Sequence, residues 1–499
     1  MLLKPRSDLK PNTADFERLP LVKSTGFREY DARWLFPGEI NLMGLNLIGL
    51  GLATLAGRRG VPKRFVVGHD YRSYSAGVKQ ALITGLLAGG AEVHDIGLAL
   101  SPMAYFAQFA LEVEGVAMVT ASHNDNGWTG IKMGFQRPLT FGPEEMTALK
   151  ETVLGGQVET ATGGRYVLVT DIAERYMQAL ADRPRLQRRL KVVAACGNGT
   201  AGAFAPQVLE RIGCEVVPLD CGLDYTFPRY NPNPEDMKML HAISEAVLAH
   251  KADVGFGFDG DGDRCGVVDN EGHEIFADKV GVMLARELSA RYAGAVFVAD
   301  VKSTGLFITD PVLKANGART LYWKTGHSYM KRYTFEQKAL AGFEKSGHFF
   351  FQPPLGKGYD DGLVAAIAVC DMLERSPGRS LADLKNALPK TWGSPTMSPH
   401  CGDEVKYGVV DKVTAQYKDA AAAGALVAGQ KIRDLVTVNG VRVVLEDGTW
   451  GLVRASSNKP ELVIVVESPA SEANMRAIFA DIDARLAKFP EVGAYNQKI

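Results

Sequence analysis

A strand–helix–strand pattern recurs three times along the chain and constrains its fold more than any other feature. The first copy reads RFVVGHD, SAGVKQALITGLLAGG and AEVHDIG, and the second reads KVVAACG, AFAPQVLERIG and CEVVPLD. The third reads AVFVADVKST, PVLKANG and TLYWKT. Such runs are typical of α/β domains whose sheets are covered by helices. The copies agree in pattern and not in residues, so a duplication is only suggested.

The last part of the chain has a different pattern. From about Ala387 onward, the strand-like runs VRVVLEDG, TWGLVRAS and ELVIVVES precede one helical run, EANMRAIFADIDARLAKF. This order predicts a smaller α+β domain. We therefore expect three similar mixed α/β domains in series and a C-terminal α+β domain, with boundaries at 1–168, 169–273, 274–386 and 387–499.

Length and charge agree with a multidomain protein that binds small molecules. The chain has 499 residues, more than one hydrophobic core usually serves. Its formal net charge of −1 gives no broad basic field for nucleic acid or a membrane surface. The six cysteines have no metal-binding spacing. The N-terminal residues resemble no secretory signal, and the apolar stretch 42–56 is too short to span a bilayer, so we expect a buried helix there and a cytoplasmic protein.

Two glycine-rich turns match the GxGxxG pattern of dinucleotide sites. In CGNGTAG, Gly197, Gly199 and Gly202 follow a strand and open a helix, and Asp220 ends the next strand. This context is close to that of a nicotinamide-binding turn, although a plain tight turn explains it as well. The second match, residues 255–260, leads directly into three aspartates. Their charge would repel a pyrophosphate.

The segment DGDGDR is the strongest local signal for chemistry. Glycines between Asp259, Asp261 and Asp263 let the three carboxylates turn toward one centre. Oxygen ligands of this kind suit Mg²⁺ or Ca²⁺. The segment is not an EF-hand, because Arg264 and Asn270 stand where that loop needs glycine and glutamate. A solvated acidic turn would leave three like charges beside the apolar strand VGFGF, so a metal site is favoured.

A serine loop offers the phosphate that would complete a magnesium shell. Ser122, in TASHN, stands just after the strand-like run GVAMVT. Taken alone, a Ser-His-Asn loop is usually turn chemistry, and no GxSxG elbow supports a hydrolase. Lys132, in GIKM, could neutralise a phosphate or transfer a proton, although a lone lysine is more often surface charge.

Two further polar loops follow apolar strands. RASSNKP offers Arg454, two hydroxyls and several N–H groups, which suit a phosphate cradle as well as a polar hairpin loop. In GFEKSGH, the side chains of Glu344, Ser346 and His348 alternate and could face sugar hydroxyls together.

Together and in this order, the four loops resemble those of the α-D-phosphohexomutase family. TASHN is similar to the family's phosphoserine loop, DGDGDR to its metal loop, GFEKSGH to its sugar-binding loop and RASSNKP to its phosphate-binding loop. The flanking segments FREYDARW, GHDYRS, NPNPED, DVKST, TGHS and YDDG match as well, so the resemblance covers nearly the whole chain. CGNGTAG resembles a second-domain turn of this family that binds no nicotinamide, which argues against the dinucleotide reading.

The resemblance implies a role for each candidate residue around a central cleft. Ser122 would carry the phosphoryl group and, with the three aspartates of DGDGDR, would hold Mg²⁺. The residues next to the transferring phosphoryl group would be Arg33 and Lys132, with Lys132 and His348 as candidates for general acid or base. The residues that bind the substrate would be Tyr30, Arg264, Lys302, His327, Glu344 and Ser346 in the cleft and Arg454, Ser456, Ser457 and Asn458 at the second phosphate.

Several positions depart from the family pattern. Phe343 replaces a glycine before the sugar-binding glutamate, and Lys345 occupies the variable position of that loop. The usual proline after Asn124 is missing, and Asn458 and Lys459 are uncommon in the phosphate-binding loop. The E-x-S-G-H form resembles the bacterial phosphomannomutase/phosphoglucomutase subgroup. These departures bear on substrate preference and leave the reaction unchanged.

The implied activity is the reversible conversion of hexose 1-phosphate and hexose 6-phosphate of glucose or mannose. It would need Mg²⁺ and hexose 1,6-bisphosphate as activator, with a fourth domain hinged near Ala387 that closes over the substrate. Phosphoglucosamine mutase is the alternative within the family. A metal-dependent phosphatase, a nucleotide-binding oxidoreductase and a non-catalytic sugar-phosphate sensor are rivals from other classes. We expect small phosphosugars as partners, no nucleic acid or membrane, and a monomer or small homo-oligomer.

Overall fold

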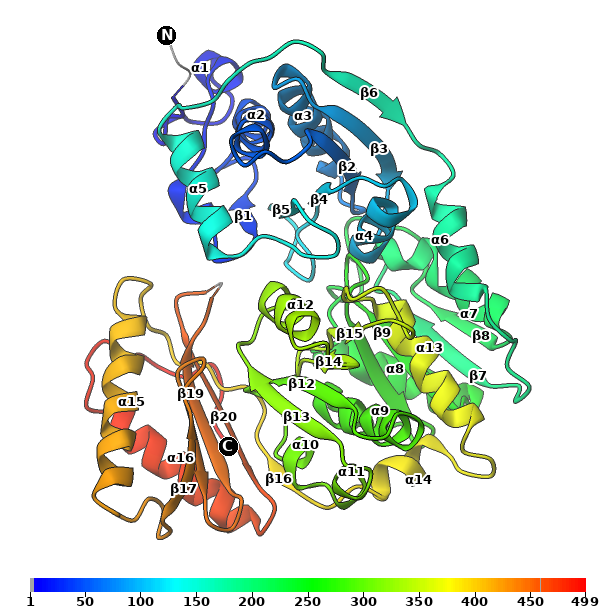
Figure 1. The fold of residues 1–499 in the computed structure, drawn as a ribbon, viewed down its shortest axis with the longest axis vertical. Coiled ribbons are helices and arrows are strands. Elements are labelled where there is room, and N and C mark those ends of the chain that lie inside the picture. The colour runs from blue at the N-terminus through cyan, green and yellow to red at the C-terminus, as the bar shows by residue number, and fades with distance from the viewer. Residues whose placement is uncertain (1–3, 458) are drawn as a thin grey trace. The chain divides into compact units, whose positions relative to one another are not determined.

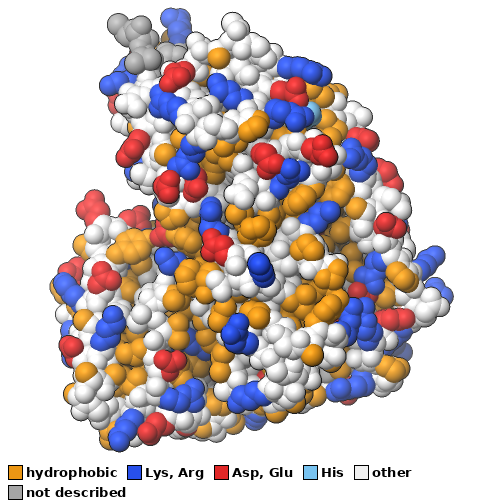
Figure 2. Space-filling model, viewed as in Figure 1, with side chains coloured by type: hydrophobic (Ala, Val, Ile, Leu, Met, Phe, Trp, Pro, Cys, Tyr) orange, Lys and Arg blue, Asp and Glu red, His pale blue; other side chains and the backbone are white. Residues whose placement is uncertain are grey.

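The computed structural model describes residues 4–457 and 459–499. The chain divides into two compact units, each built from two separate stretches of sequence (Figure 1). The first unit contains the chain up to Ala277 together with Ser346–Ala382, and the second contains Asp278–Lys345 and Asp383–Ile499. On the face drawn in Figure 2, basic and acidic side chains are interspersed.

The first unit begins with a six-stranded sheet of order β1-β5-β4-β2-β3-β6. Strands β4, β2, β3 and β6 are parallel neighbours, and β5 and β1 add to one edge in antiparallel fashion. The bounds of its strands are β1 (Ala32–Leu35), β2 (Arg64–His69), β3 (Glu92–Leu98), β4 (Gly115–Val119), β5 (Trp128–Gly134) and β6 (Arg165–Leu168). Its helices are α1 (Ala14–Arg18), the short 3₁₀ turn η1 (Ser24–Gly26), α2 (Leu42–Arg58), α3 (Ser75–Ala88), α4 (Ser101–Ala110) and α5 (Pro143–Leu154).

Helix α2 is the buried helix expected for the apolar stretch 42–56. It packs tightly against α3 because glycines stand at the contact. A Cβ atom on Gly49 would lie 2.1 Å from the carbonyl oxygen of Leu82, and one on Gly85 would lie 1.8 Å from that of Asn46. No helix among residues 4–457 and 459–499 has the length and apolar character needed to cross a membrane.

The second sheet of this unit has the order β11-β10-β9-β7-β8. Strand β7 is parallel to β8 and β9, whereas β9 and β10 form an antiparallel hairpin whose connection is the DGDGDR segment. The bounds of its strands are β7 (Lys191–Ala195), β8 (Glu215–Leu219), β9 (Val254–Phe258), β10 (Cys265–Asp269) and β11 (Glu274–Ile275). Its helices are α6 (Ile172–Ala181), the 3₁₀ turn η2 (Thr200–Ala203), α7 (Ala205–Ile212) and α8 (Met237–His250).

A later stretch of the chain returns to complete this second layer. It contributes α13 (Gly362–Glu374), which packs against α7 and β10, and the same stretch contains the short strand β15 (Phe349–Phe351). The hydroxyl of Tyr176 donates to Asp361 at 2.9 Å, and the Sγ atoms of Cys214 and Cys370 lie 4.0 Å apart. The first unit is therefore complete only when residues 346–382 have joined it.

The second unit contains a parallel sheet in which β12 lies between β13 and β14. The bounds are β12 (Val296–Asp300), β13 (Arg319–Trp323) and β14 (Ala341–Phe343), with helices α9 (Ala277–Arg291), α10 (Leu306–Thr309), α11 (Pro311–Ala315) and α12 (His327–Glu336). Because the three strands are parallel, the loops that follow them emerge at one edge of the sheet.

The same unit ends in an antiparallel sheet of order β16-β20-β19-β18-β17. Its elements are α14 (Leu381–Asn386), β16 (Trp392–Gly393), α15 (Lys406–Ala422), β17 (Ile432–Val436), β18 (Val441–Leu445), β19 (Trp450–Ala455), β20 (Leu462–Ser468) and α16 (Glu472–Leu486). The sequence patterns identified β18, β19, β20 and α16, and the structure adds α15, β16 and β17. The predicted class of three α/β domains and a C-terminal α+β domain is confirmed, and the four domain ranges remain predictions.

Candidate active site

Ser122 is held in a strained and fully supported backbone conformation after β4. Its φ angle is +52°, in the left-handed region that side chains other than glycine rarely adopt. Its N–H donates to the hydroxyl of Thr120 at 2.8 Å, and its carbonyl accepts from Arg72 at 2.9 Å. The side chain is buried. These bonds fix the backbone of Ser122 before any substrate arrives.

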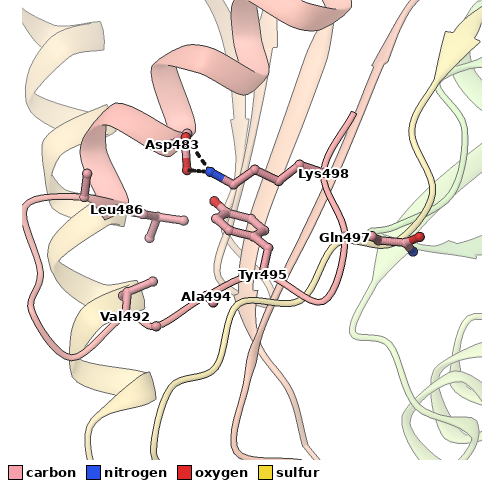
Figure 3. Close-up of a pocket in the computed structure, with 9 residues that line it drawn as sticks. Asp483, Leu486, Val492, Ala494, Tyr495, Gln497 and Lys498 are labelled. Carbon is pink, nitrogen blue, oxygen red and sulfur yellow. Dashed lines mark hydrogen bonds and ion pairs between the residues drawn. The ribbon is translucent and has the colours of Figure 1, made fainter.

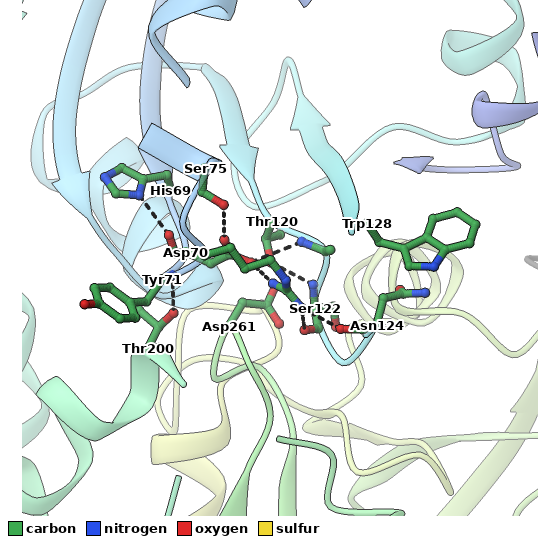
Figure 4. A network of polar contacts seen from close by, with 12 residues as sticks. His69, Asp70, Tyr71, Ser75, Thr120, Ser122, Asn124, Trp128, Thr200 and Asp261 are labelled. Atoms are coloured by element: carbon green, nitrogen blue, oxygen red, sulfur yellow. Dashed lines mark hydrogen bonds and ion pairs between the residues drawn. The ribbon is translucent and has the colours of Figure 1, made fainter. Parts of the chain in front are cut away.

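One buried carboxylate, that of Asp70, orders the serine loop (Figure 4). It forms a short ion pair with Arg72 and accepts from the hydroxyls of Ser75 at 2.5 Å and Thr120 at 2.9 Å. It also accepts from the N–H of Ala121 at 3.1 Å. The sequence alone assigns no role to Asp70, although the segment GHDYRS that contains it was among those resembling the family.

The three aspartates of the β9–β10 connection converge as their spacing predicts. Ligand oxygens of Asp259, Asp261 and Asp263 all lie within 4.8 Å of one another, and the three side chains are buried. Burial, and then the charges of its two neighbours, raise the pKa of Asp259 well above its usual value. Three such carboxylates need a cation to remain ionised together.

A metal ion fits this donor set. Oδ1 of Asp261 is buried and has no hydrogen-bond partner among residues 4–457 and 459–499. An unsatisfied carboxylate oxygen beside two other carboxylates is what a hard divalent cation would bind. The cluster could therefore hold a metal ion.

Lys132, on β5, places its ammonium against the same cluster. Its Nζ atom lies 2.7 Å from Asp261 and pairs closely with Asp263. Burial would lower the pKa of Lys132, but the two carboxylates outweigh it and raise that pKa well above its usual value. Burial and Asp263 would likewise raise the pKa of Asp261, and Lys132 and Ser101 reverse this shift and lower it. The ammonium form of Lys132 is therefore favoured in this geometry.

The serine loop and the metal loop meet directly. The hydroxyl of Ser122 donates to Oδ2 of Asp259 at 3.0 Å. Gly260 lies so close that a Cβ atom there would be 2.5 Å from the carbonyl oxygen of Ser122. Arg33 reaches the same loop from β1, donating from Nη1 to the carbonyl of Thr120 at 2.6 Å. Two motifs that lie far apart in sequence thus form one site.

The CGNGTAG turn packs behind the metal loop. The N–H of Thr200 donates to the carbonyl of Gly260 at 3.3 Å, and its hydroxyl accepts from the N–H of Tyr71 at 2.9 Å. A Cβ atom on Gly199 would lie 3.3 Å from the Cα atom of Gly260. The turn is occupied by these contacts, which favours the tight-turn interpretation over a dinucleotide site.

The second half of the sugar-binding loop lies beside the metal loop within the first unit. Nε2 of His348 is 3.3 Å from Asp263, and Nδ1 of His348 is 3.1 Å from the hydroxyl of Ser346. Arg264 donates its N–H to Asp259 at 3.2 Å and pairs with Glu235 at 3.2 Å. Tyr30 is buried in the loop that precedes β1.

The second unit gathers three further predicted residues at the carboxyl edge of its parallel sheet. Lys302, His327 and Glu344 follow β12, β13 and β14 respectively, and all three are buried. The carboxylate of Glu344 accepts a short hydrogen bond from the N–H of Gly326. Because parallel strands end at one edge, the topology accounts for this grouping.

The two departures in the sugar-binding loop have structural reasons. The ring of Phe343 is buried and stacks on Phe307 with ring centroids 5.5 Å apart. The ammonium of Lys345 lies 3.8 Å from Asp278, and its N–H donates to Asp300 at 3.2 Å. Phe343 therefore packs in the core of the second unit, and Lys345 forms an ion pair within it.

The phosphate-binding loop follows β19. Arg454 and Ser456 are buried and Ser457 is half-buried, whereas Asn458 lies outside the described residues. Lys406, which the sequence motifs did not identify, donates to the carbonyls of Ser456 at 2.6 Å and Lys459 at 3.0 Å. It thereby holds both ends of the loop.

A separate pocket of about 510 Å³ lies between the end of α16 and the C-terminal residues (Figure 3). Lys498 pairs with Asp483 across it at 2.9 Å. None of the residues predicted for the site from sequence lines this pocket.

Comparison with known proteins matches four domain families in order along the chain. All are described as phosphoglucomutase/phosphomannomutase: α/β/α domain I over residues 24–158, domain II over 174–272, domain III over 276–392 and the C-terminal domain over 405–485.

Curated relatives and a solved structure agree with these matches. A phosphomannomutase/phosphoglucomutase of Pseudomonas syringae is 33% identical over 471 residues, which cover 94% of this chain and 96% of the relative. A phosphoglucomutase of Neisseria meningitidis is 31% identical over 450 residues, 90% of this chain and 94% of the relative. The crystal structure of a phosphoglucomutase/phosphomannomutase family protein from Burkholderia thailandensis is 30% identical, with a TM-score of 0.84 over 94% of this chain and 98% of that one. The resemblance noted in the sequence is confirmed, and the chain belongs to the phosphoglucomutase/phosphomannomutase family of phosphohexomutases.

Proposed function

We propose that this chain interconverts hexose 1-phosphate and hexose 6-phosphate of glucose and mannose, with Ser122 as the phosphoryl carrier. The observation that carries the proposal is the hydrogen bond from the Ser122 hydroxyl to Asp259, within a buried cluster of three aspartates. Without a metal ion, a phosphorylated serine at this place would meet three carboxylates whose only close ammonium, among the described residues, is that of Lys132. With a metal ion, its charge and theirs would be balanced. Only the second arrangement is electrostatically reasonable.

Asp259, Asp261 and Asp263 would hold Mg²⁺ together with an oxygen of the serine phosphate. When bound, the ion would neutralise charge on the transferring group and polarise it. Lys132 adds a positive charge beside Asp261 and Asp263. The ammonium and the ion together balance the carboxylates.

The chemical step is an exchange of phosphate esters. A free hydroxyl of the sugar attacks the phosphorus atom, the bond between phosphorus and Oγ of Ser122 breaks, and the hydroxyl proton passes to a base. His348, whose ring lies between Ser346 and Asp263, is our candidate for that base. Lys132 is suited to supply positive charge and not to accept a proton, because its pKa is raised. Arg33 holds the serine loop beside the phosphoryl group.

The remaining predicted residues would bind the sugar and its second phosphate. Tyr30, Arg264, Lys302, His327, Glu344 and Ser346 would contact the sugar, and Arg454, Ser456, Ser457 and Asn458 would bind the phosphate that is not transferred. The hexose 1,6-bisphosphate intermediate turns end over end between two transfers, and added bisphosphate would act as an activator by phosphorylating Ser122. Phosphosugars are the expected partners, in the cytoplasm.

To test this proposal, the turnover of glucose 1-phosphate, mannose 1-phosphate and glucosamine 1-phosphate is measured, each with Mg²⁺ and a trace of glucose 1,6-bisphosphate. We expect conversion of the first two to 6-phosphates with little free phosphate. Ser122→Ala should lose at least about a thousandfold in kcat, because the carrier oxygen is gone. Ser7→Ala, the same change at an exposed serine, should match the wild type. Chelation with EDTA should abolish turnover, and Mg²⁺ should restore it.

Each rival activity has its own result. Turnover of glucosamine 1-phosphate alone would favour phosphoglucosamine mutase, whereas steady release of inorganic phosphate would favour a phosphatase. Wild-type turnover by Ser122→Ala would refute the carrier assignment.

A further inference from the structure

Lys302 is a buried cation in the loop after β12. Its side chain is only 7% exposed. Among the residues that the structure describes, its ammonium makes no hydrogen bond or ion pair. A buried and unpaired ammonium is costly unless an anion binds to it. Because the ammonium forms no bond within the described part of the chain that would anchor it, the position of Lys302 depends on the groups that hold its backbone.

Arg442, on β18, binds the backbone on both sides of Lys302. Its Nη1 atom donates to the carbonyl of Val301 at 2.9 Å and to that of Ser303 at 2.6 Å. Arg442 is 2% exposed, so these bonds form away from water. One guanidinium nitrogen thus fixes the two peptide units that set the position of Lys302.

Two aromatic rings fix Arg442 itself. Its guanidinium carbon lies 3.6 Å from the centre of the Trp450 ring and 4.1 Å from that of Tyr322. The hydroxyl of Tyr322 accepts from Nη2 of Arg442 at 3.2 Å and donates to the carbonyl of Thr304 at 2.7 Å. A planar guanidinium between two rings has little freedom to rotate.

Glu467, on β20, holds the next part of the loop. Its carboxylate accepts from the hydroxyl of Thr304 at 2.8 Å and from the N–H of Gly305 at 2.8 Å. It also pairs with Lys279 at 2.6 Å. The residues that flank Lys302 are therefore bound by side chains of the C-terminal sheet, which also carries Arg454 at the end of β19.

We propose that Arg442 is a positioning residue that places the Lys302 ammonium for the anionic substrate through the carbonyls of Val301 and Ser303. Because Trp450 and Arg454 belong to the same strand, this contact also sets Lys302 in register with the phosphate-binding loop. The proposal rests on the proposed function, since it concerns binding of a sugar phosphate. In this proposal Arg442 supports substrate binding through Lys302, without touching the substrate itself.

The test is a double-mutant cycle of Arg442→Lys and Lys302→Met, read as kcat/KM for glucose 1-phosphate. Lysine keeps the charge of Arg442 but cannot keep its planar, stacked fork. We expect Arg442→Lys alone to lower kcat/KM by about 10-fold or more, because misplacement of a binding group is costly. In the Lys302→Met background the same change should cost less than about twofold, because its target is gone. Arg433→Lys, at an exposed position in the same sheet, is the matched control and should have no effect in either background.

Equal losses in both backgrounds would overturn the proposal, because a merely structural role loosens the enzyme whether or not Lys302 is present. No loss in the wild-type background would overturn it as well. If Arg442→Lys does not fold, Tyr322→Phe runs the same cycle with the same criteria, because it removes only the hydroxyl that bridges Arg442 and the loop. Failure of the proposed function is a separate result, since the wild type would then turn over none of the hexose phosphates.

Discussion

Replacing Glu467 by glutamine removes one buried charge and keeps the shape of the side chain. Burial alone would raise the pKa of Glu467, but the charge of Lys279 and the hydrogen bonds from Lys279 and Gly305 outweigh it and lower the pKa from 4.5 to about 2. A difference of about 2.5 pH units at 1.36 kcal/mol per unit corresponds to about 3 kcal/mol of stability near pH 7. Glu467→Gln should lower the free energy of unfolding by about that amount, and Lys279, left without its partner, would add to the loss.

The sign of the pH dependence follows from a depressed pKa. The stabilisation from Glu467 is fully present above pH 4.5 and is lost as the pH falls toward about 2. The wild type should therefore exceed Glu467→Gln by about 3 kcal/mol from pH 7 to pH 5, and by only about 2 kcal/mol at pH 3.5.

Urea unfolding of both full-length proteins at pH 7, 5 and 3.5 measures this gap. Tryptophan fluorescence is a suitable signal, because Nε1 of Trp450 donates to Glu467. The control is Glu472→Gln, which removes an exposed ion pair with Arg476 and should change little. A gap below about 1 kcal/mol at pH 7, or a gap that does not shrink in acid, would refute the reasoning that the carboxylate is stabilised by its partners.

Three further changes test the site. Gly260→Ala should lower kcat/KM at least about 10-fold, because the new Cβ atom would lie 2.5 Å from the carbonyl oxygen of Ser122. The control Gly222→Ala should leave kcat/KM unchanged, because a Cβ atom there would have no neighbour among the described residues within 4 Å. Equal activity of the two variants would contradict the close approach of Gly260 to Ser122. Lys132→Met should lose about 3 kcal/mol of unfolding free energy in EDTA. Added Mg²⁺ should raise the melting temperature of this variant more than that of the wild type. An equal rise for both proteins would contradict the inference that Lys132 and the metal ion neutralise the same carboxylates. Arg454→Lys should raise the KM for glucose 1-phosphate about 10-fold and keep kcat within about threefold of the wild type, because it weakens binding of the phosphate that does not react. Steady-state kinetics that show a fall in kcat alone would contradict the phosphate-binding role of Arg454.

The sequence allowed the fold class and the family to be predicted because their signals are local. Alternating strands and helices reveal α/β domains, and the glycines of DGDGDR allow three carboxylates to converge whatever the rest of the chain does. The meeting of Ser122 with Asp259 was expected only through the resemblance. The roles proposed for individual site residues remain predictions, as do the domain boundaries.

The supporting residues could not be predicted, because their partners are remote in sequence. Arg442 and Val301 are 141 positions apart, and no pattern around either one indicates the contact. Asp70 looks like an ordinary turn residue after β2 until β4 brings Thr120 beside it. Lys345 was read for its bearing on substrate preference, and only the fold shows that it pairs with Asp278.

The return of α13 to the first unit sets an order for biosynthesis. Cys214 and Cys370, which lie side by side in the folded unit, are 156 positions apart in the chain. At about 5–20 residues per second, a ribosome needs roughly 10 to 30 seconds to make the residues between them. During that interval, the face of α7 and β10 that α13 will cover has no partner, and the whole segment of the second unit up to Lys345 emerges in between. The nascent chain thus has a period in which chaperones can bind an open apolar surface, and a ribosome stalled before Gly362 would leave the serine and metal loops without the helix that completes their unit.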